Sequence, residues 1–287
     1  MTARLPAVVS TEWLAAKLGT PGIRVVDGSW YLPGSGRDAA TEYAAGHIPG
    51  AVFFDIDASS DPNTSLPHML PTAERFAGRM AALGLSDSDH IVVYDGSGQN
   101  LSAPRVWWTF RTFGHDRVSV LDGGIGKWRR EHRPIEQGVI NLSPGRFTAR
   151  LDRAAVRDLA SVRANIHQPV EQLVDTRSAG RFAGVEPEPR PGLRGGHVPG
   201  SVNLPFTDLV RPDGTLLPVE ELRRRLADAG IDLSRPVVAS CGSGTSACAL
   251  VLCLHLIGYT QTAVYDGAWA EWGGRADTPI ESEVNSS

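Results

Sequence analysis

Short apolar runs alternate with segments of helical periodicity along the first half of the chain. Uninterrupted runs rich in Val and Ile are typical of buried strands, and apolar residues three to four positions apart indicate amphipathic helices. This pattern predicts strands at 23–26, 91–94 and 118–121. It predicts helices at 11–18, 72–83, 103–113 and 125–130. Ser10 is the expected N-cap of the first helix.

The second half repeats the same alternation. Strands are predicted at 172–174, 236–240 and 262–264. Helices are predicted at 153–163, 219–229 and 245–257. Strands that alternate with helices imply an α/β fold, with a mostly parallel sheet flanked by helices on both faces. Long loops at 32–37 and 184–196 interrupt the two halves, and loops of this length usually serve a site or an interface.

Three landmarks recur in the same order and at nearly the same offset, which indicates an internal duplication. They are Gly-His-(Ile/Val)-Pro-Gly at 46–50 and 196–200, Val-(Leu/Tyr)-Asp-Gly at 120–123 and 264–267, and an apolar pair followed by Asp at 25–27 and 173–175. We therefore expect one domain at 5–133, a linker at 134–150 and a second copy of the domain at 151–280.

Composition restricts the function classes. The 287 residues are 41% hydrophobic and 21% charged, as in soluble globular proteins, and the net charge of −4 favours neither nucleic acid nor an anionic membrane as a partner. Three cysteines form no disulfide framework or metal cluster, and no nucleotide-binding motif follows a strand, so we expect no metal and no cofactor. The first nine residues hold no signal-peptide core, and we expect a cytoplasmic protein.

The strongest chemical signal is Cys241, which lies between a predicted strand and a predicted helix in the run Cys-Gly-Ser-Gly-Thr-Ser. Unpaired N–H groups and the positive end of the helix dipole favour a thiolate there, and the glycines let the loop curl into an anion-binding nest. Cys241 is then a nucleophile for anionic sulfur. The alternative is a buried, inert cysteine beside a tight turn.

The duplication distinguishes the two halves at this position. Aligning the repeats places Asp95 where the second copy has Cys241. An aspartate cannot carry sulfur, so the first copy is expected to be inactive and the second catalytic. Because His47 and His197 have the same setting in both copies, they are expected to be structural and to bond the backbone. Asp27 and Asp175 end equivalent strands and are also expected to be architectural.

The chain resembles the tandem-domain rhodanese family over nearly its whole length. The resemblance rests on both Gly-His-X-Pro-Gly motifs and on the residues at 27–33, 53–57, 67–71, 102–108, 180–182, 188–190 and 241–244. Gly-Ser-Gly after the cysteine is similar to the branch that uses 3-mercaptopyruvate, whereas the thiosulfate branch has Arg-Lys-Gly. The family usually continues Gly-Val-Thr-Ala, but this chain has Thr245 and Ser246 before Ala247.

The resemblance implies sulfur transfer through a Cys241 persulfide, with release of pyruvate and delivery of the sulfur to cyanide or to a thiol, thioredoxin included. It assigns Arg181 and Arg190, in the long loop of the second copy, to the donor's carboxylate, for which an arginine fork is suited. It assigns a Ser–His–Asp relay to Ser243, His68 and Asp57. The remaining loop residues expected to bind the donor are Gly242, Gly244, Thr245 and Ser246.

Three other functions remain to be weighed against this one. A cysteine phosphatase shares the strand–loop–helix design but needs an arginine that closes the loop, and none lies between Cys241 and His255. A thiosulfate sulfurtransferase differs only in its donor. A non-enzymatic sulfur carrier or partner-binding module is disfavoured by the presence of Cys241, Arg181 and Arg190 together.

Overall fold

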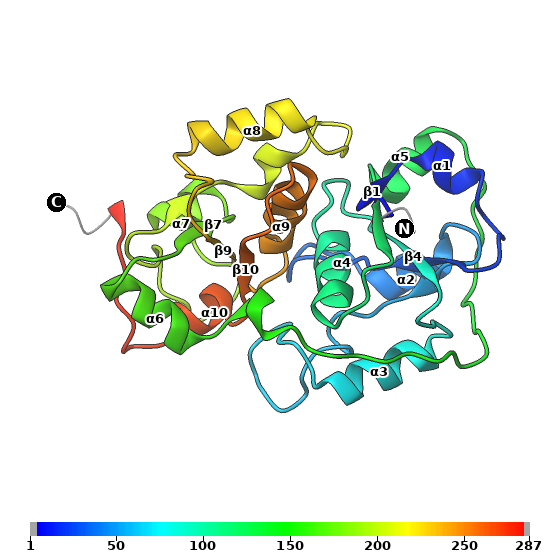
Figure 1. The fold of residues 1–287 in the computed structure, drawn as a ribbon, viewed down its shortest axis with the longest axis horizontal. Coiled ribbons are helices and arrows are strands. Elements are labelled where there is room, and N and C mark those ends of the chain that lie inside the picture. Colours follow the sequence, from blue (N-terminus) through cyan, green and yellow to red (C-terminus); the bar gives the residue numbers. More distant parts are fainter. Residues whose placement is uncertain (1–4, 284–287) are drawn as a thin grey trace. The chain divides into compact units, whose positions relative to one another are not determined.

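A computed structural model describes residues 5–283, so the first four residues of the stretch considered for a signal peptide lie outside the described residues. The chain divides into two compact units (Figure 1). Unit 1 contains the described residues up to Pro62, Leu70–Asp152 and Val210–Leu216. Unit 2 contains Asn63–Met69, Arg153–Leu209 and the described residues from Leu217 onward. Each unit therefore includes a short segment from the other repeat, and His68 belongs to unit 2.

Each unit is built on a five-stranded sheet in which all neighbouring strands are parallel. The order in unit 1 is β1 (Val8–Val9), β5 (Val118–Leu121), β4 (His90–Tyr94), β2 (Ile23–Asp27) and β3 (Val52–Phe53). The order in unit 2 is β6 (Val156–Arg157), β10 (Thr262–Tyr265), β9 (Val237–Ser240), β7 (Gln172–Asp175) and β8 (Val202–Asn203). The identical strand order confirms the duplicated α/β fold.

Helices cover the sheets. Unit 1 has α1 (Thr11–Ala15), α2 (Ala39–Ala45), α3 (Ala73–Ala82), α4 (Ala103–Thr112) and α5 (Gly124–Arg130). Unit 2 has α6 (Leu159–His167), α7 (Ala179–Ala183), α8 (Val219–Asp228), α9 (Ala247–Leu256), α10 (Ala268–Trp272) and the 3-10 helices η1 (Arg153–Ala155) and η2 (Phe206–Leu209). The predicted cap of α1 is confirmed, because Ser10 Oγ accepts the N–H of Trp13.

The helix after the Cys241 loop is the core of unit 2. The first eight residues of α9 are all buried, and they carry apolar or small side chains around the whole circumference. This helix packs against β9, β10, η2 and α8. Packing on every side fixes the position of this helix, and the loop of Cys241 leads directly into its N-terminus.

The sequence misplaced or missed several short elements. The helix predicted at 153–163 was wrong in its first part, because Val156 and Arg157 pair with β10 as strand β6. The helix begins only at Leu159, where Asp158 caps it by accepting the N–H of Ser161. The short elements α2, α7, α10, β1, β3 and β8 were not predicted. The two-residue strands are too short to show a period, and the three helices of five to seven residues span no more than about two turns.

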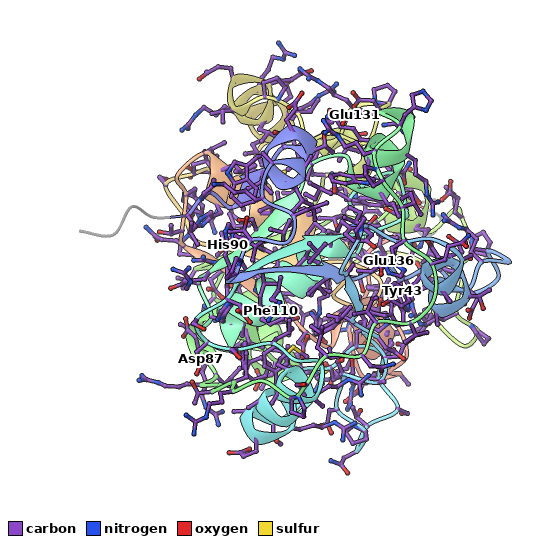
Figure 2. All side chains as sticks on the ribbon, turned by 90° about the vertical axis from the view of Figure 1, so that its right-hand side faces the viewer. Tyr43, Asp87, His90, Phe110, Glu131 and Glu136 are labelled. Carbon is purple, nitrogen blue, oxygen red and sulfur yellow. The ribbon has the colours of Figure 1, made fainter. Side chains whose placement is uncertain are left out.

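The stretch between the repeats packs along unit 1. Gly145 N donates to Ala81 O at 2.8 Å, and the ring of Phe147 packs edge-on against Phe76. Figure 2 labels Phe110, a further member of this aromatic cluster, whose ring lies 5.8 Å from that of Phe147. Among the described residues, no helix is long and apolar enough to span a membrane.

The structural role expected for the two motif histidines is confirmed. His47 Nδ1 lies 2.9 Å from the carbonyl oxygen of Tyr43, and His197 Nδ1 lies 2.8 Å from that of Phe182. His47 also exchanges both main-chain hydrogen bonds with Glu136, which Figure 2 labels beside the first sheet. Each histidine therefore ties its turn to the backbone of a neighbouring segment.

Candidate active site

The loop that follows β9 carries the predicted nucleophile. Cys241 directly follows Ser240, the last residue of the strand, and is only 2% exposed. The first turn of α10 supports the loop, because Trp269 N donates to the Cys241 carbonyl at 2.9 Å and Ala270 N donates to that of Gly242 at 3.0 Å. Two main-chain bonds thus fix the orientation of the cysteine.

The loop offers unpaired donors around the cysteine. Within residues 5–283, the N–H groups of Gly242, Ser243, Thr245 and Ser246 donate to no other group. Gly244 has a φ of +74°, a left-handed conformation that lets the backbone curl and that favours glycine. Buried N–H groups need acceptors, so the loop is suited to hold an anion such as a thiolate, a persulfide or part of an anionic donor.

A guanidinium lies against the loop. A Cβ added to Gly242 would stand 2.8 Å from Arg181 Nη2, so a glycine at this position permits the close approach. The position of Arg181 in the long loop was predicted wrongly, since it lies on the short helix α7, which Ser178 caps. Arg181 is held by Glu188, whose Oε2 accepts from Nη2 at 2.5 Å and whose two oxygens each accept from Nε at 3.2 Å.

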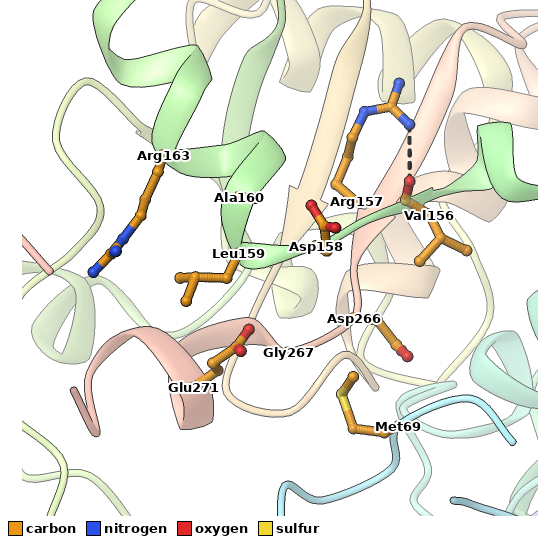
Figure 3. A pocket seen from close by; sticks show the side chains of 10 residues that line it. All are labelled: Met69, Val156, Arg157, Asp158, Leu159, Ala160, Arg163, Asp266, Gly267 and Glu271. Atoms are coloured by element: carbon orange, nitrogen blue, oxygen red, sulfur yellow. Dashed lines mark hydrogen bonds between the residues drawn. The ribbon is translucent and has the colours of Figure 1, made fainter.

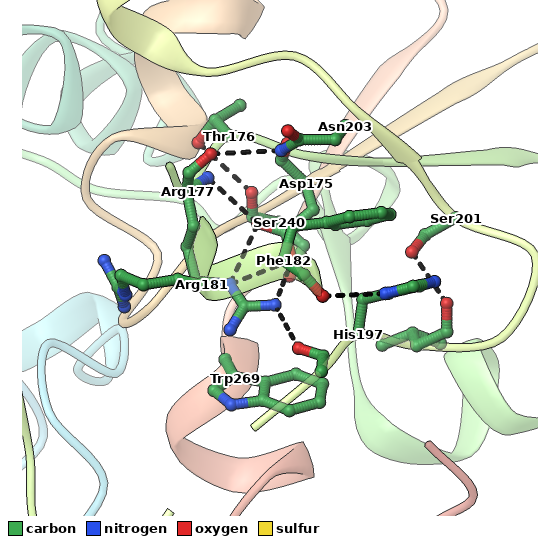
Figure 4. Close-up of polar contacts among 12 residues, drawn as sticks. Asp175, Thr176, Arg177, Arg181, Phe182, His197, Ser201, Asn203, Ser240 and Trp269 are labelled. Atoms are coloured by element: carbon green, nitrogen blue, oxygen red, sulfur yellow. Dashed lines mark hydrogen bonds and ion pairs between the residues drawn. The ribbon is translucent and has the colours of Figure 1, made fainter. Parts of the chain in front are cut away.

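Arg181 belongs to an ionic network with Glu188, Arg177 and Asp175, and Figure 4 labels both arginines and Asp175. Arg177 donates to both oxygens of Asp175, to Glu188 Oε1 at 2.7 Å and to the carbonyl of Gly196 at 2.8 Å. Its guanidinium lies 4.3 Å from the ring centroid of Trp269. Burial alone lowers the pKa of Arg177, but the carboxylates of Asp175 and Glu188 outweigh it and raise the pKa above its usual value.

Arg177, Glu188 and Trp269 are residues to which the sequence analysis gave no role. The Asp-Thr-Arg run that begins at the last residue of β7 was the available signal, because charged side chains next to a buried strand need partners when they are buried. The sequence alone does not place Glu188 between the two arginines, since that contact depends on the path of the loop after α7.

His68 belongs to unit 2 and reaches the same loop. It is buried, with a φ of +62°, and its Nδ1 lies 2.9 Å from Thr245 Oγ1 and 3.2 Å from the main-chain oxygen of Ser243. The Thr245 hydroxyl, the closer of the two groups, can donate to this nitrogen or accept from it, depending on the ring tautomer. The loop hydroxyl on His68 is thus that of Thr245, whereas the predicted relay residue Ser243 contributes its carbonyl.

Three further residues that the sequence assigned to the site are Ser246, Arg190 and Asp57. Ser246 is buried, and its hydroxyl is shared with Thr176 Oγ1 at 3.1 Å. Arg190 is half-buried in the loop after α7. Asp57 belongs to unit 1, where its carboxylate accepts from Trp30 Nε1 at 3.2 Å. The structure therefore brings Arg181 and His68 to the loop of Cys241 and Gly242.

Unit 2 also contains a cavity of about 430 Å³ at the end of β6 and β10 (Figure 3). Met69, Leu159, Asp266 and Glu271 are among its lining residues. Met69 follows His68, and Glu271 lies on α10, so two walls of the cavity belong to segments that contact the Cys241 loop. Among the described residues, no group of three or more His, Cys, Asp or Glu side chains is placed to hold a metal ion.

One family profile and three known proteins are similar to this chain. The family profile described as "Rhodanese-like domain" matches residues 10–131 and 158–275. The human 3-mercaptopyruvate sulfurtransferase is 46% identical, over 94% of this chain and 93% of its own length. The Arabidopsis thaliana thiosulfate/3-mercaptopyruvate sulfurtransferase 1, a mitochondrial protein, is 44% identical over 98% of this chain and 79% of its own. A crystal structure of an Escherichia coli 3-mercaptopyruvate sulfotransferase superposes with a TM-score of 0.85 at 41% identity, covering 92% of this chain and 99% of the other.

Proposed function

Because this chain belongs to the rhodanese family, we propose that it moves sulfane sulfur from 3-mercaptopyruvate through a Cys241 persulfide to an acceptor, and releases pyruvate. The observation that carries the proposal is the setting of Cys241. The cysteine is buried in a loop with unpaired N–H groups and lies next to the residue that Arg181 touches. The loop N–H groups can hold the negative charge of the Cys241 thiolate or persulfide, and Arg181 can hold that of the donor's carboxylate.

In the first half-reaction the Cys241 thiolate attacks the donor sulfur. A sulfur–sulfur bond forms, the donor's carbon–sulfur bond breaks, and its electron pair passes to carbon as the enolate of pyruvate. A proton then converts the enolate to pyruvate. The free edge of Arg181 pairs with the donor's carboxylate, with Arg190 as the second predicted partner, while the loop N–H groups stabilise the persulfide anion.

In the second half-reaction an acceptor attacks the outer sulfur. A thiolate becomes a persulfide, or cyanide becomes thiocyanate, and the Cys241 thiolate is restored. A small thiol or thioredoxin is the proposed physiological acceptor. The cytoplasm remains the proposed compartment, although the Arabidopsis relative is described as mitochondrial.

We propose that His68 and a loop hydroxyl supply the proton for the departing enolate. Thr245 Oγ1 and His68 Nδ1 share a hydrogen bond at 2.9 Å, so a proton can pass between the two groups. Asp57 keeps the relay role that the resemblance gives it, and the hydroxyl of Ser243, which the resemblance places in the relay, is the alternative to that of Thr245. The first copy, 5–133, is proposed to be the inactive domain because it has Asp95, and the second, 151–280, to be the catalytic one.

Steady-state kinetics with mercaptopyruvate and with thiosulfate test the proposed function. We expect pyruvate formation with the first donor and a mass increase of one sulfur atom on Cys241. Cys241→Ser should lower turnover by roughly 10⁴-fold or more, because a hydroxyl is a far weaker nucleophile. Cys253→Ala, in the buried core of α9, is the control. Faster turnover with thiosulfate would assign the other donor, and absence of the mass shift would favour a non-enzymatic module.

The variants Thr245→Val and Ser243→Ala distinguish the roles of the two loop hydroxyls. If the Thr245–His68 contact delivers the proton, Thr245→Val should lower kcat by about 10-fold or more, while Ser243→Ala has the smaller effect. The reverse order would return the role to Ser243. Asp57→Asn should lower kcat only if that carboxylate takes part in the relay.

A further inference from the structure

Arg181 has two edges that can form paired hydrogen bonds, and Glu188 occupies one of them. The Nε and Nη2 atoms donate to Glu188, and Nη2 also lies against Gly242. In the described part of the chain, Nη1 donates to no group. The fork formed by Nη1 and Nη2 is therefore the edge left to receive a planar carboxylate.

Glu188 itself is fixed by a second arginine. Its side chain is 2% exposed, and Oε1 accepts from Arg177 Nη1 at 2.7 Å. Arg177 cannot bind a donor, because its side chain is fully buried and each of its three nitrogens already donates to Asp175, Glu188 or Gly196. It acts only through the groups that it holds.

Arg177 reaches the nucleophile loop by two separate routes. One runs through Glu188 and Arg181 to Gly242. The other runs through the indole of Trp269, on which Arg177 stacks and whose main-chain N–H supports the Cys241 carbonyl. The two carboxylates and two guanidinium groups of the network also sum to zero charge, so no net charge remains to repel an anion.

We propose that Arg177 and Glu188 are positioning residues that fix which edge of Arg181 faces the donor, and that they thereby select sulfur donors that carry a carboxylate. This inference rests on the proposed function only in taking the donor to carry that group. A positioning role and a purely electrostatic role of Glu188 predict opposite effects of Glu188→Gln on anion binding. Removal of the negative charge should strengthen the attraction of an anion, whereas loss of the fixed partner of Arg181 should weaken its recognition.

The experiment compares two alkylating reagents of similar size. Iodoacetate carries a carboxylate and iodoacetamide does not, and both transfer their carbon to the Cys241 thiolate with loss of iodide. The ratio of their rates at Cys241, measured by peptide mass spectrometry, reports carboxylate recognition without any sulfur donor. We expect Glu188→Gln to lower the iodoacetate to iodoacetamide ratio by about 10-fold, the loss of one charge-assisted hydrogen bond.

The controls separate positioning from stability. Glu171→Gln removes the carboxylate paired with Arg157 in the same unit, and it should leave the ratio within about twofold, as expected for a distant screened charge. Arg177→Lys, which keeps the buried charge but loses the fork, should lower the ratio by a smaller factor than Glu188→Gln. In kinetics with mercaptopyruvate, Glu188→Gln should raise KM more than it lowers kcat.

An unchanged or increased ratio in Glu188→Gln would overturn the proposal, as would an equal loss of rate with both reagents. These outcomes are independent of the proposed sulfur transfer. A protein that forms no pyruvate but shows the expected ratios would refute the reaction and keep the positioning role, whereas the opposite result would refute the positioning role alone.

Discussion

The loops after β4 and β9 occupy equivalent places in the two units, yet they satisfy their N–H groups in opposite ways. In unit 1 the carboxylate of Asp95 accepts the N–H groups of Ser97, Ser102 and Ala103, the last two at the start of α4. In unit 2 Cys241 takes the same position, and several loop N–H groups have no partner among the described residues. One loop contains its own anion, and the other is suited to receive one.

The side chains that lie beside the two loops also differ between the units. A Cβ on Gly96 would lie 2.5 Å from Tyr31 Oη, and a Cβ on Gly242 would lie 2.8 Å from Arg181 Nη2. Both side chains are held by a glutamate, Tyr31 by Glu42 and Arg181 by Glu188. In unit 1 the phenol of Tyr31 lies nearest to Gly96, and the guanidinium of Arg37 also reaches the loop, because Nη2 donates to the Gly96 carbonyl at 3.1 Å. In unit 2 the guanidinium of Arg181 lies nearest to Gly242, and its fork can bind a carboxylate. The duplicated fold thus keeps the frame of the site while the chemistry differs.

The largest expected difference concerns stability after each loop loses its central side chain. Asp95→Ala leaves several N–H groups without their acceptor and should reduce the free energy of unfolding by about 3 kcal/mol. Cys241→Ala removes only a small buried atom and should cost about 1 kcal/mol. Urea unfolding measures both. Equal losses would contradict the view that the Asp95 loop is satisfied internally and the Cys241 loop is not.

A second difference is expected in the pH dependence of stability. Burial raises the pKa of Asp27 to about 6, against the opposing hydrogen bond from Ser29. The pKa of Asp27 is higher in the folded protein than in the unfolded chain. Its contribution to the free energy of unfolding is therefore largest below about pH 4 and falls by up to ~3 kcal/mol as the pH rises through about 6. Asp27→Asn should therefore flatten the unfolding free energy between pH 4 and 7.

The matched control for that measurement is Asp175→Asn, at the equivalent position of unit 2. This variant keeps Asp27, so the decline between pH 4 and 7 should persist, while the loss of the ion pair with Arg177 should lower stability. If the slope disappears in Asp175→Asn and persists in Asp27→Asn, the two aspartates have been assigned the wrong roles.

The smallest expected difference concerns the two glycines. Gly242→Ala should displace the end of the Arg181 side chain and raise the donor KM about threefold, with little loss of stability. Gly96→Ala should leave kinetics unchanged and lower the unfolding free energy by about 1 kcal/mol, because Tyr31 must move within a hydrogen-bonded cluster. Steady-state kinetics and urea unfolding of both variants measure these effects. An altered KM in Gly96→Ala alone would reverse the comparison.

Much of the fold followed from the sequence because its evidence is local. The apolar runs at 91–94 and 118–121 are long enough to identify buried strands, and Ser10 marks a helix start by its own side chain. The recurrence of Gly-His-X-Pro-Gly identified the duplication, and the identical strand order of both sheets confirms it. The two-residue strand β6, which depends on pairing with β10, and the five-residue helix α7 were missed or misplaced.

The sequence by itself determined the duplicated α/β frame, the place of Cys241 between a strand and a helix, and the replacement of that cysteine by Asp95 in the other copy. These follow from local patterns and from alignment of the chain with itself. Only the tertiary structure decided that Thr245 provides the hydroxyl on His68, and that Arg177 and Glu188 hold Arg181. The physical reason is that such contacts join residues on separate elements, and their geometry depends on how loops close over the ends of the sheet.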